Sequence, residues 1–280
     1  MRRRTFLLGG LGLLGAGGAS FLAGTLASTS PAAVAAAPLP RGSALLQHPR
    51  RLPPSIPQPV ALPFDFATPS LERVAAPSII TDLPGEGNLI ALTVDDGGSS
   101  ETVAGYVRWI EETSMRVTFF VTGSLPSWSE NAAALAPLIA DGRAQMANHT
   151  WSHADLTTAS DQQIIDELST NEDFIVSTFG VSAKPYFRPP FGRYDDRVLA
   201  AASSVGYTTC VLWYGSLADA GLITEPQLVQ FATEWLLPQH VVIGHANYPT
   251  VVAVMPQLTG ILRDRGLQPV TLDDVFVRAG

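Results

Sequence analysis

From residue 87 onward, short runs of apolar residues alternate with stretches that have the spacing of amphipathic helices. Such continuous apolar runs are typical of strands buried in a parallel sheet, and they lie at residues 89–94, 117–121, 207–212 and 241–243. One of the predicted helices runs from Ser160, which forms a capping-box pattern with Gln163, to Gly180 in the usual C-terminal position. The alternation predicts a parallel α/β domain, and roughly seven units without an internal repeat favour a closed or nearly closed barrel.

Polar side chains follow the strand-like runs at five places. These clusters are Asp95-Asp96, His149 with His153, Arg188, Trp213 and His245. A parallel sheet or barrel gathers the carboxyl ends of its strands on one face, where enzymes of this class build their sites. Adjacent carboxylates and two histidines supply suitable ligands for a divalent metal ion. The sequence therefore indicates a metal-dependent hydrolase.

Each half of the predicted metal site has an alternative explanation. Asp95 and Asp96 repel each other, which favours neutralisation by a metal ion or a cation, although they can also cap the helix that follows. His149 and His153 have a spacing that suits Zn²⁺, but histidine pairs also occur by chance on surfaces. With Asp96 as the third protein ligand, open positions remain for water and substrate, as in catalytic zinc sites.

The other clusters also allow a structural and a chemical role. Arg188, ahead of two prolines, is either a surface arginine or a two-point clamp on a carboxylate. The backbone N–H of Phe191 is a candidate donor to an oxyanion. His245 is either an ordinary strand-end histidine or a general acid. Trp213 is a flat apolar wall for a sugar ring or an acyl pocket.

The N-terminal segment, residues 1–37, has the pattern of a bacterial export signal. Its start, Arg3-Arg4-Thr5-Phe6-Leu7, resembles the twin-arginine type, and residues 33–37 contain two A-x-A cleavage patterns. The alternative is an uncleaved membrane anchor, because the uncharged stretch is long enough to span a bilayer. We expect a secreted or cell-envelope protein that contacts a membrane only through this segment, if it is not cleaved.

Residues 38–86 are rich in proline and predict an extended linker, or an arm that wraps the domain over about residues 60–80. Residues 87–280 are then long enough to form one domain with its own core. Removal of residues 1–37 takes away three arginines and no acids, so the net charge goes from −8 to −11. An acidic protein is a poor partner for nucleic acid or an anionic membrane surface, and we expect a monomer.

Three remaining residues are expected to have no chemical role. Cys210 is the only cysteine, which excludes an intrachain disulfide, and it lies in an apolar run that predicts burial. His48 in the proline-rich segment and His240 after a predicted helix are expected on the surface.

Residues 87–278 resemble the NodB-homology polysaccharide deacetylases, carbohydrate esterase family 4. That family's first three motifs, T-F-D-D-G, H-[ST]-x-x-H and R-x-P-[YF]-G, correspond in order to Thr93-Val94-Asp95-Asp96-Gly97, His149-Thr150-Trp151-Ser152-His153 and Arg188-Pro189-Pro190-Phe191-Gly192. The fourth motif departs from W-x-x-D-x-x-D-W, because Trp213 is followed by Tyr214-Gly215-Ser216-Leu217-Ala218-Asp219. The fifth, L-x-H, is Ile243-Gly244-His245, and Ala246 stands where an aspartate often follows.

The resemblance implies a distorted (β/α)₇ barrel and the hydrolysis of N-acetyl, occasionally O-acetyl, groups on a carbohydrate such as chitin or peptidoglycan. It assigns the ligands of Zn²⁺, or of another divalent ion such as Co²⁺, to Asp96, His149 and His153. It makes Asp95, held by Arg188, the base and His245 the acid. Phe191 N–H then stabilises the oxyanion, while Ile243 and Trp213 line the acetyl pocket; Asp219 is the uncertain candidate for tuning His245.

Three alternatives remain beside this assignment. One is a non-catalytic wall- or carbohydrate-binding member that has lost a tuned acid through its altered fourth motif. The others are an esterase acting on acetylated xylan and an amidase acting on a non-sugar substrate. Specificity is expected in the loops at residues 124–132 and 217–224.

Overall fold

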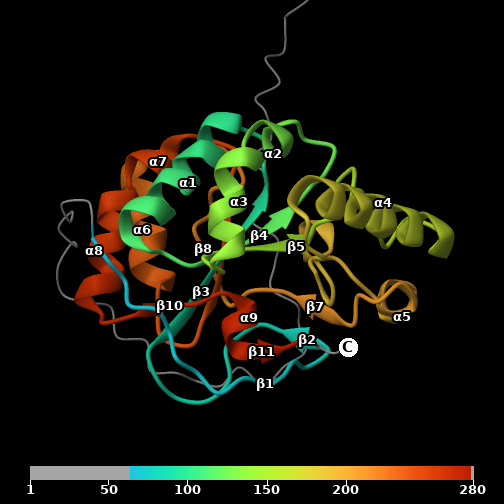
Figure 1. The fold of residues 1–280 in the computed structure, drawn as a ribbon, viewed down its shortest axis with the longest axis horizontal. Helices are drawn as coiled ribbons and strands as arrows, with labels where there is room; N and C mark the ends of the chain where they lie inside the picture. The colour runs from blue at the N-terminus through green and yellow to red at the C-terminus, as the bar shows by residue number, and fades with distance from the viewer. Residues whose placement is uncertain (1–63, 279–280) are drawn as a thin grey trace, which may run out of the picture. The chain divides into compact units, whose positions relative to one another are not determined.

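The computed structural model describes residues 64–278, so the predicted export signal and residues 38–63 lie outside the described part of the chain. Strands and helices alternate along it (Figure 1). In chain order the elements are β1 (Val74–Ala75), β2 (Ile79–Ile80), β3 (Leu89–Asp96), α1 (Ser100–Thr113), β4 (Val117–Val121), α2 (Ser127–Glu130), α3 (Ala132–Ala140), β5 (Ala144–Asn148), α4 (Asp161–Phe179), β6 (Tyr186–Phe187), a 3₁₀ turn (Pro190–Gly192), α5 (Asp196–Ser204), β7 (Thr209–Val211), β8 (Gly215–Ser216), α6 (Glu225–Trp235), β9 (Val241–His245), α7 (Thr250–Ala253), α8 (Met255–Asp264), β10 (Gln268–Pro269), α9 (Leu272–Val275) and β11 (Phe276–Val277).

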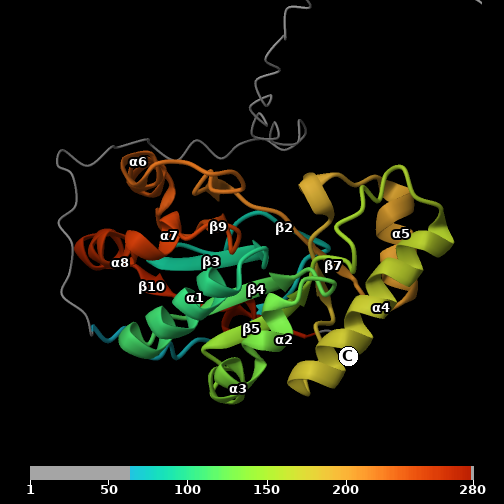
Figure 2. The same ribbon diagram turned by 90° about the horizontal axis from the view of Figure 1, so that it is seen from above.

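One curled sheet of nine strands forms the centre of the described domain (Figure 2). Its strands follow the order β2-β7-β6-β5-β4-β3-β9-β8, with β10 added beside β3, and the paired strands are parallel. Helices follow one another around its outer face in the order α5, α4, α3, α1, α7 and α6. This arrangement confirms the predicted distorted (β/α)₇ barrel. No described helix has both the length and the apolar character needed to span a bilayer.

The curled sheet is closed by the chain itself between β7 and β8. Residues 209–211 pair with β6 and β2, whereas residues 215–216 pair with β9 on the other side. Between them, Leu212 N–H donates to Ile80 O at 2.7 Å and Tyr214 N–H donates to Val241 O at 2.9 Å. Because the strand pairing is interrupted between β7 and β8, backbone carbonyls there need hydrogen-bond donors from elsewhere in the structure.

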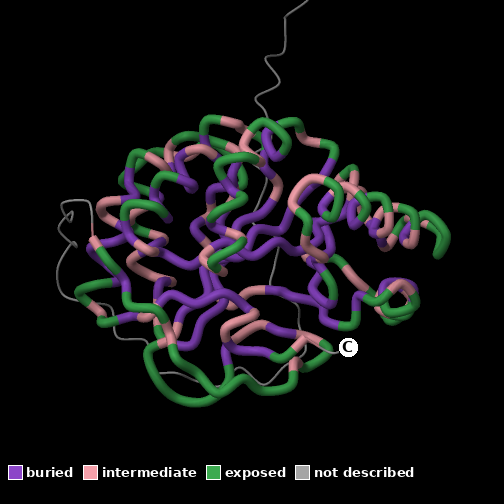
Figure 3. The backbone as a smooth tube through the Cα atoms, in the orientation of Figure 1, coloured by how far each residue is buried: buried purple, intermediate pink, exposed green. Residues whose placement is uncertain are grey.

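The two-residue repeat of the strands separates an inner from an outer core. On β3, Ile90, Leu92 and Val94 contribute to the core under the helices, and Ala91 contributes to the core inside the barrel. Thr93 and Asp95 lie on the same inner side. Residues of α9 and β11 also belong to the inner core, and the strands of the sheet are coloured mostly as buried in Figure 3.

The longest helix, α4, begins and ends where its sequence predicts. The Ser160 hydroxyl accepts from Gln163 N–H at 3.3 Å, and the Gln163 side chain accepts from Ser160 N–H at 2.8 Å. Gly180 ends the helix in the left-handed conformation with φ 73°. Ile164, Leu168 and other apolar residues of its inner face are buried against the sheet, so packing and capping act together.

Residues 64–86 lie against the domain. Phe64 N–H and Phe66 N–H donate to carbonyls at the end of α1, both at 2.8 Å, and β2 pairs with β7 inside the main sheet. The sheet therefore begins before residue 87. Cys210 is buried as predicted. His240 was expected on the surface, but it is only 3% exposed because it leads directly into the buried strand β9.

Candidate active site and metal centre

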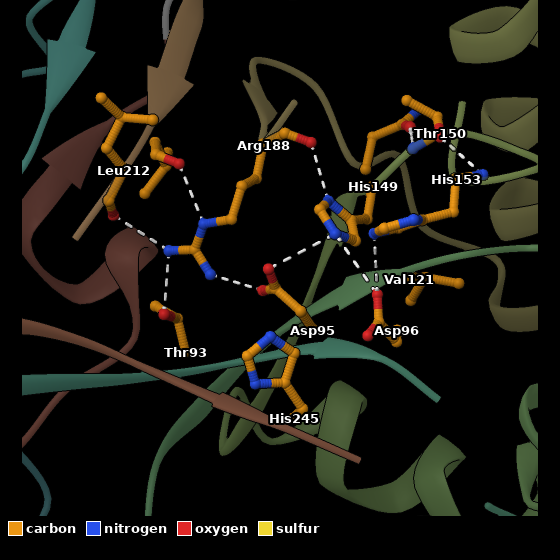
Figure 4. Close-up of polar contacts among 12 residues, drawn as sticks. Thr93, Asp95, Asp96, Val121, His149, Thr150, His153, Arg188, Leu212 and His245 are labelled. Carbon is orange, nitrogen blue, oxygen red and sulfur yellow. Dashed lines mark hydrogen bonds and ion pairs between the residues drawn. The ribbon is translucent and has the colours of Figure 1, made fainter. Parts of the chain in front are cut away.

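The polar clusters that follow the strands meet at the carboxyl ends of the barrel strands (Figure 4). Asp95 and Asp96 end β3, and His245 ends the neighbouring strand β9, directly opposite Asp95 in the sheet register. His149 follows β5 and Arg188 follows β6. The barrel therefore places residues from four strands within reach of one substrate.

Asp96, His149 and His153 converge with the geometry of a three-ligand metal site. One ligand atom from each lies within 4.8 Å of the others. Oδ1 of Asp96 is 3.4 Å from Nε2 of His149 and 3.3 Å from Nε2 of His153. This oxygen is buried and has no hydrogen-bond partner, which is unfavourable unless a ligand such as a cation satisfies it.

The surroundings of the two histidines orient them and shift their pKa values in opposite directions. Burial lowers the pKa of His149, but the charge of Asp95 and the contact with Asp96 raise it above its ordinary value. Nδ1 of His149 is 2.8 Å from the carbonyl oxygen of Arg188, so its N–H donates there and Nε2 keeps its lone pair for a metal ion. Burial and the neighbouring His149 lower the pKa of His153. Burial would raise the pKa of Asp96, but the nearby His149, His245 and His153 lower it well below its ordinary value. These residues fit a divalent cation.

Unusual backbone conformations gather around this trio. Asp96, Thr150, His153 and Phe191 all have positive φ, between 61° and 71°, a conformation that is strained for residues other than glycine. Local bonds hold it: Trp128 Nε1 donates to Asp96 O at 2.7 Å, and Thr150 N–H donates to Asn148 Oδ1 at 2.8 Å. The strained backbone conformations therefore lie at and beside the residues of the candidate metal site.

Arg188 holds Asp95 with one nitrogen atom. Nη1 contacts Oδ1 of Asp95 at 2.5 Å, and both side chains are almost fully buried. The remaining donors go to Val211 O at 2.9 Å, Leu212 O at 3.0 Å and Thr93 Oγ1 at 2.9 Å. The predicted two-point clamp on the carboxylate is therefore absent from this structure, because Arg188 also satisfies the carbonyls freed where β7 breaks.

His245 has a carboxylate partner, Asp219. Nδ1 of His245 lies 3.0 Å from Oδ1 of Asp219, and His245 N–H donates to Oδ2 at 3.2 Å. Burial lowers the pKa of His245, but the hydrogen bond to Asp219 and the charges of Asp219, Asp95 and Asp96 raise it to about 9. The imidazole is held cationic at neutral pH with its other nitrogen available.

The candidate substrate-contacting residues surround this centre. Phe191 is 48% exposed, and its ring meets the His153 ring edge-on with 4.7 Å between the ring centroids. The backbone N–H of Phe191 has no acceptor among the described residues. Trp213 lies against Gly192, where an added Cβ would come within 2.8 Å of its ring. Ile243 is buried on β9, and its carbonyl accepts from Leu217 N–H at 2.9 Å.

A hollow of about 460 Å³ opens beside the metal ligands. Asp96 and His153 line it together with Ser124, Ser152 and Tyr248. No arginine or lysine contributes to its lining among the described residues.

Three further residues, which were not predicted from the sequence, hold the site. Thr93 accepts from Arg188 and donates to Val242 O at 2.9 Å. Trp128 fixes the backbone of Asp96. Asn247 donates to Oδ2 of Asp96 at 2.7 Å. A signal existed for Thr93, within the first motif, and for Asn247, two residues after His245, but no sequence pattern marks Trp128, which lies in the short helix α2.

Comparison with known proteins agrees with this geometry. Residues 82–210 match the family model described as polysaccharide deacetylase. Chitin deacetylase 1 of Cryptococcus neoformans is 33% identical over 171 residues, 61% of this chain and 34% of that protein. The peptidoglycan-N-acetylglucosamine deacetylase PgdA of Listeria monocytogenes is 28% identical over 196 residues, 67% of this chain and 38% of that protein. The chain thus spans about a third of the length of these relatives.

Solved structures share the fold. PdaA of Bacillus subtilis, a family 4 carbohydrate esterase, aligns with a TM-score of 0.63 at 21% identity over 71% of this chain and 84% of its own. A family 4 pseudoenzyme of Bacillus anthracis aligns with a TM-score of 0.62 at 19% identity over 72% of this chain and 71% of its own. Fold alone therefore does not separate active from inactive members. Residues 82–210 are therefore similar to the polysaccharide deacetylase family, and the described domain has the fold of the family 4 carbohydrate esterases.

Proposed function

We propose that this chain is an exported, metal-dependent hydrolase that removes N-acetyl groups from a carbohydrate polymer or oligomer of the chitin or peptidoglycan type. The observation that carries the proposal is the trio Asp96, His149 and His153, whose ligand atoms converge beside a second buried carboxylate, Asp95. The relatives named for chitin and peptidoglycan deacetylation support this substrate class.

Asp96, His149 and His153 would hold Zn²⁺ or another divalent ion such as Co²⁺. When bound, such an ion polarises a carbonyl group and lowers the pKa of water. The single carboxylate and two imidazoles leave further positions open, as catalytic centres require.

Asp95 is the proposed general base. Arg188 occupies its Oδ1, whereas Oδ2 lies 3.4 Å from Nε2 of His149 and so faces the ligand trio. Oδ2 takes a proton from the attacking water as the new C–O bond forms at the acetyl carbonyl. The fixed position of Asp95 between Arg188 and the trio holds this base in one geometry.

His245 is the proposed general acid. It protonates the amine nitrogen as the C–N bond breaks, and the products are acetate and a free amino group on the sugar. Asp219 keeps the imidazole oriented and charged. The N–H of Phe191 would donate to the developing oxyanion, with Trp213 and Ile243 as walls of the acetyl pocket.

The contact between Asp219 and His245 favours an enzyme over a non-catalytic carbohydrate-binding member. The altered fourth motif raised the possibility of a lost acid, but a carboxylate is within hydrogen-bonding distance of the histidine. An esterase acting on acetyl-xylan or an amidase acting on a non-sugar substrate would use the same catalytic groups. An assay that compares the substrates distinguishes these activities.

The test is an acetate-release assay on N-acetylated chitooligosaccharides, peptidoglycan and acetyl-xylan, with and without added Zn²⁺. We expect zinc-dependent release from at least one N-acetylated glycan. Binding to these glycans without acetate release would contradict the proposal and support the non-catalytic alternative, whereas release from acetyl-xylan alone would support the esterase.

The proposed location is the outside of the cell or the cell envelope, because chitin and peptidoglycan lie there. Export by the twin-arginine route and a monomeric state belong to the same proposal. Fractionation of a tagged full-length chain in a bacterial host, with and without an Arg3→Lys, Arg4→Lys change, tests the route. Export unaffected by the double change would contradict it.

A further inference from the structure

Asn247 forms a hydrogen bond with one carboxylate oxygen of Asp96, and the other oxygen remains available to a metal ion. Nδ2 of Asn247 donates to Oδ2 of Asp96 at 2.7 Å. The other oxygen, Oδ1, is buried without a partner and faces Nε2 of both His149 and His153. A carboxylate that is bonded through one oxygen in this way presents the other to a cation.

The same amide also holds the loop that carries Asp96. Oδ1 of Asn247 accepts from Gly98 N–H at 2.9 Å, and a Cβ added to Gly98 would lie 2.7 Å from that oxygen. Asn247 therefore joins the loop after β9 to the loop after β3. The contact supports Asp96 at a residue whose φ is 71°, a conformation that needs support from its surroundings.

An asparagine is well suited to this position. Its side chain donates to the carboxylate and accepts from the backbone N–H at the same time. An aspartate here would accept only, and it would add a negative charge beside Asp96. Leu or Ala would leave Asp96 Oδ2 without a side-chain donor at this position.

We propose that Asn247 is a positioning residue of the metal centre, which selects Oδ1 of Asp96 as the ligand atom and fixes its direction. This role rests on the metal site of the proposed function. It does not depend on which acetylated substrate the site accepts.

The first test measures Zn²⁺ affinity in the full chain by competition with a chromophoric chelator. Asn247→Ala is expected to weaken binding by about 10- to 100-fold, the usual effect of removing such an outer partner, and Asn247→Asp by at least as much. Asn88→Asp is the matched control, because Asn88 lies beside the opposite end of β3, where its amide donates to Gly266 O. Its Zn²⁺ affinity should equal that of the wild type.

The second test moves Asn247 without changing it. Gly98→Ala pushes the amide away from Asp96, so it should weaken Zn²⁺ binding in the same direction. In the double variant with Asn247→Ala the two losses should not add, because both remove one interaction. The absorption spectrum of bound Co²⁺ should also differ from that of the wild type in each single variant, since the direction of one ligand changes.

The outcomes separate this role from the proposed function. Wild-type Zn²⁺ affinity in Asn247→Ala, or additive losses in the double variant, would overturn the role of Asn247. Circular dichroism shows which variants are folded, and Gly98→Ala tests the role if Asn247→Ala does not fold. A wild-type chain that binds Zn²⁺ but releases no acetate would contradict the deacetylase proposal alone, and one that binds no divalent ion would overturn both.

Discussion

The metal-binding half and the acid half of this site are built in different ways. The metal-binding half uses two short sequence motifs: Asp96 ends one strand, and His149 and His153 lie four residues apart in one turn that contains residues of positive φ. The acid half joins His245 to Asp219, which lies 26 residues away in the sequence and reaches it because β8 pairs with β9. Motifs describe the first half well, whereas the second depends on the fold.

Burial differs between the groups of the site. The Arg188–Asp95 pair between them is almost fully buried, so neither group can lose its partner without leaving an uncompensated charge. His245 retains some exposure toward the substrate side. The predictions below separate these contributions.

The largest effect is expected from Asp95→Asn. The amide is nearly isosteric but cannot take a proton, so turnover should fall by about 10²- to 10⁴-fold. Asp95 is not among the three proposed ligands, and Zn²⁺ affinity should stay close to that of the wild type. Acetate release at the wild-type rate by this variant would contradict the assignment of Asp95 as the base.

An intermediate effect is expected from Asp219→Asn. Its negative charge helps to raise the pKa of His245 to about 9, so the acid is protonated at neutral pH and is lost as the pH rises through that value. Without the charge the pKa of His245 falls, and the alkaline limb of the kcat profile should move to lower pH. An unchanged alkaline limb would show that Asp219 does not tune the acid.

Sequence reasoning succeeded where the chemistry and the secondary structure are local. The capping pattern at Ser160 predicts the start of helix α4, and the apolar run before Asp95 predicts strand β3. Both predictions succeed because capping and burial depend on a few neighbouring residues. The donor role of Asn247 toward Asp96 spans 151 residues and follows from sheet register. The distribution of Arg188 donors follows from the break between β7 and β8, which the sequence does not mark.

The smallest effect is expected from Ser160→Ala. Loss of the N-cap of α4 should lower the free energy of unfolding by about 1 kcal/mol, measured by urea denaturation. Acetate release per folded molecule should not change, because α4 supports the barrel from outside. A large loss of turnover at full folding would show that this helix contributes directly to the site.

The central claim is that both halves act through one metal-dependent centre. The most direct measurement is acetate release from an N-acetylated chitooligosaccharide by the chain after treatment with a chelator, and again after addition of Zn²⁺ or Co²⁺. We predict that release stops on chelation and returns with the divalent ion. Release that continues at the original rate in the metal-free protein would contradict the account.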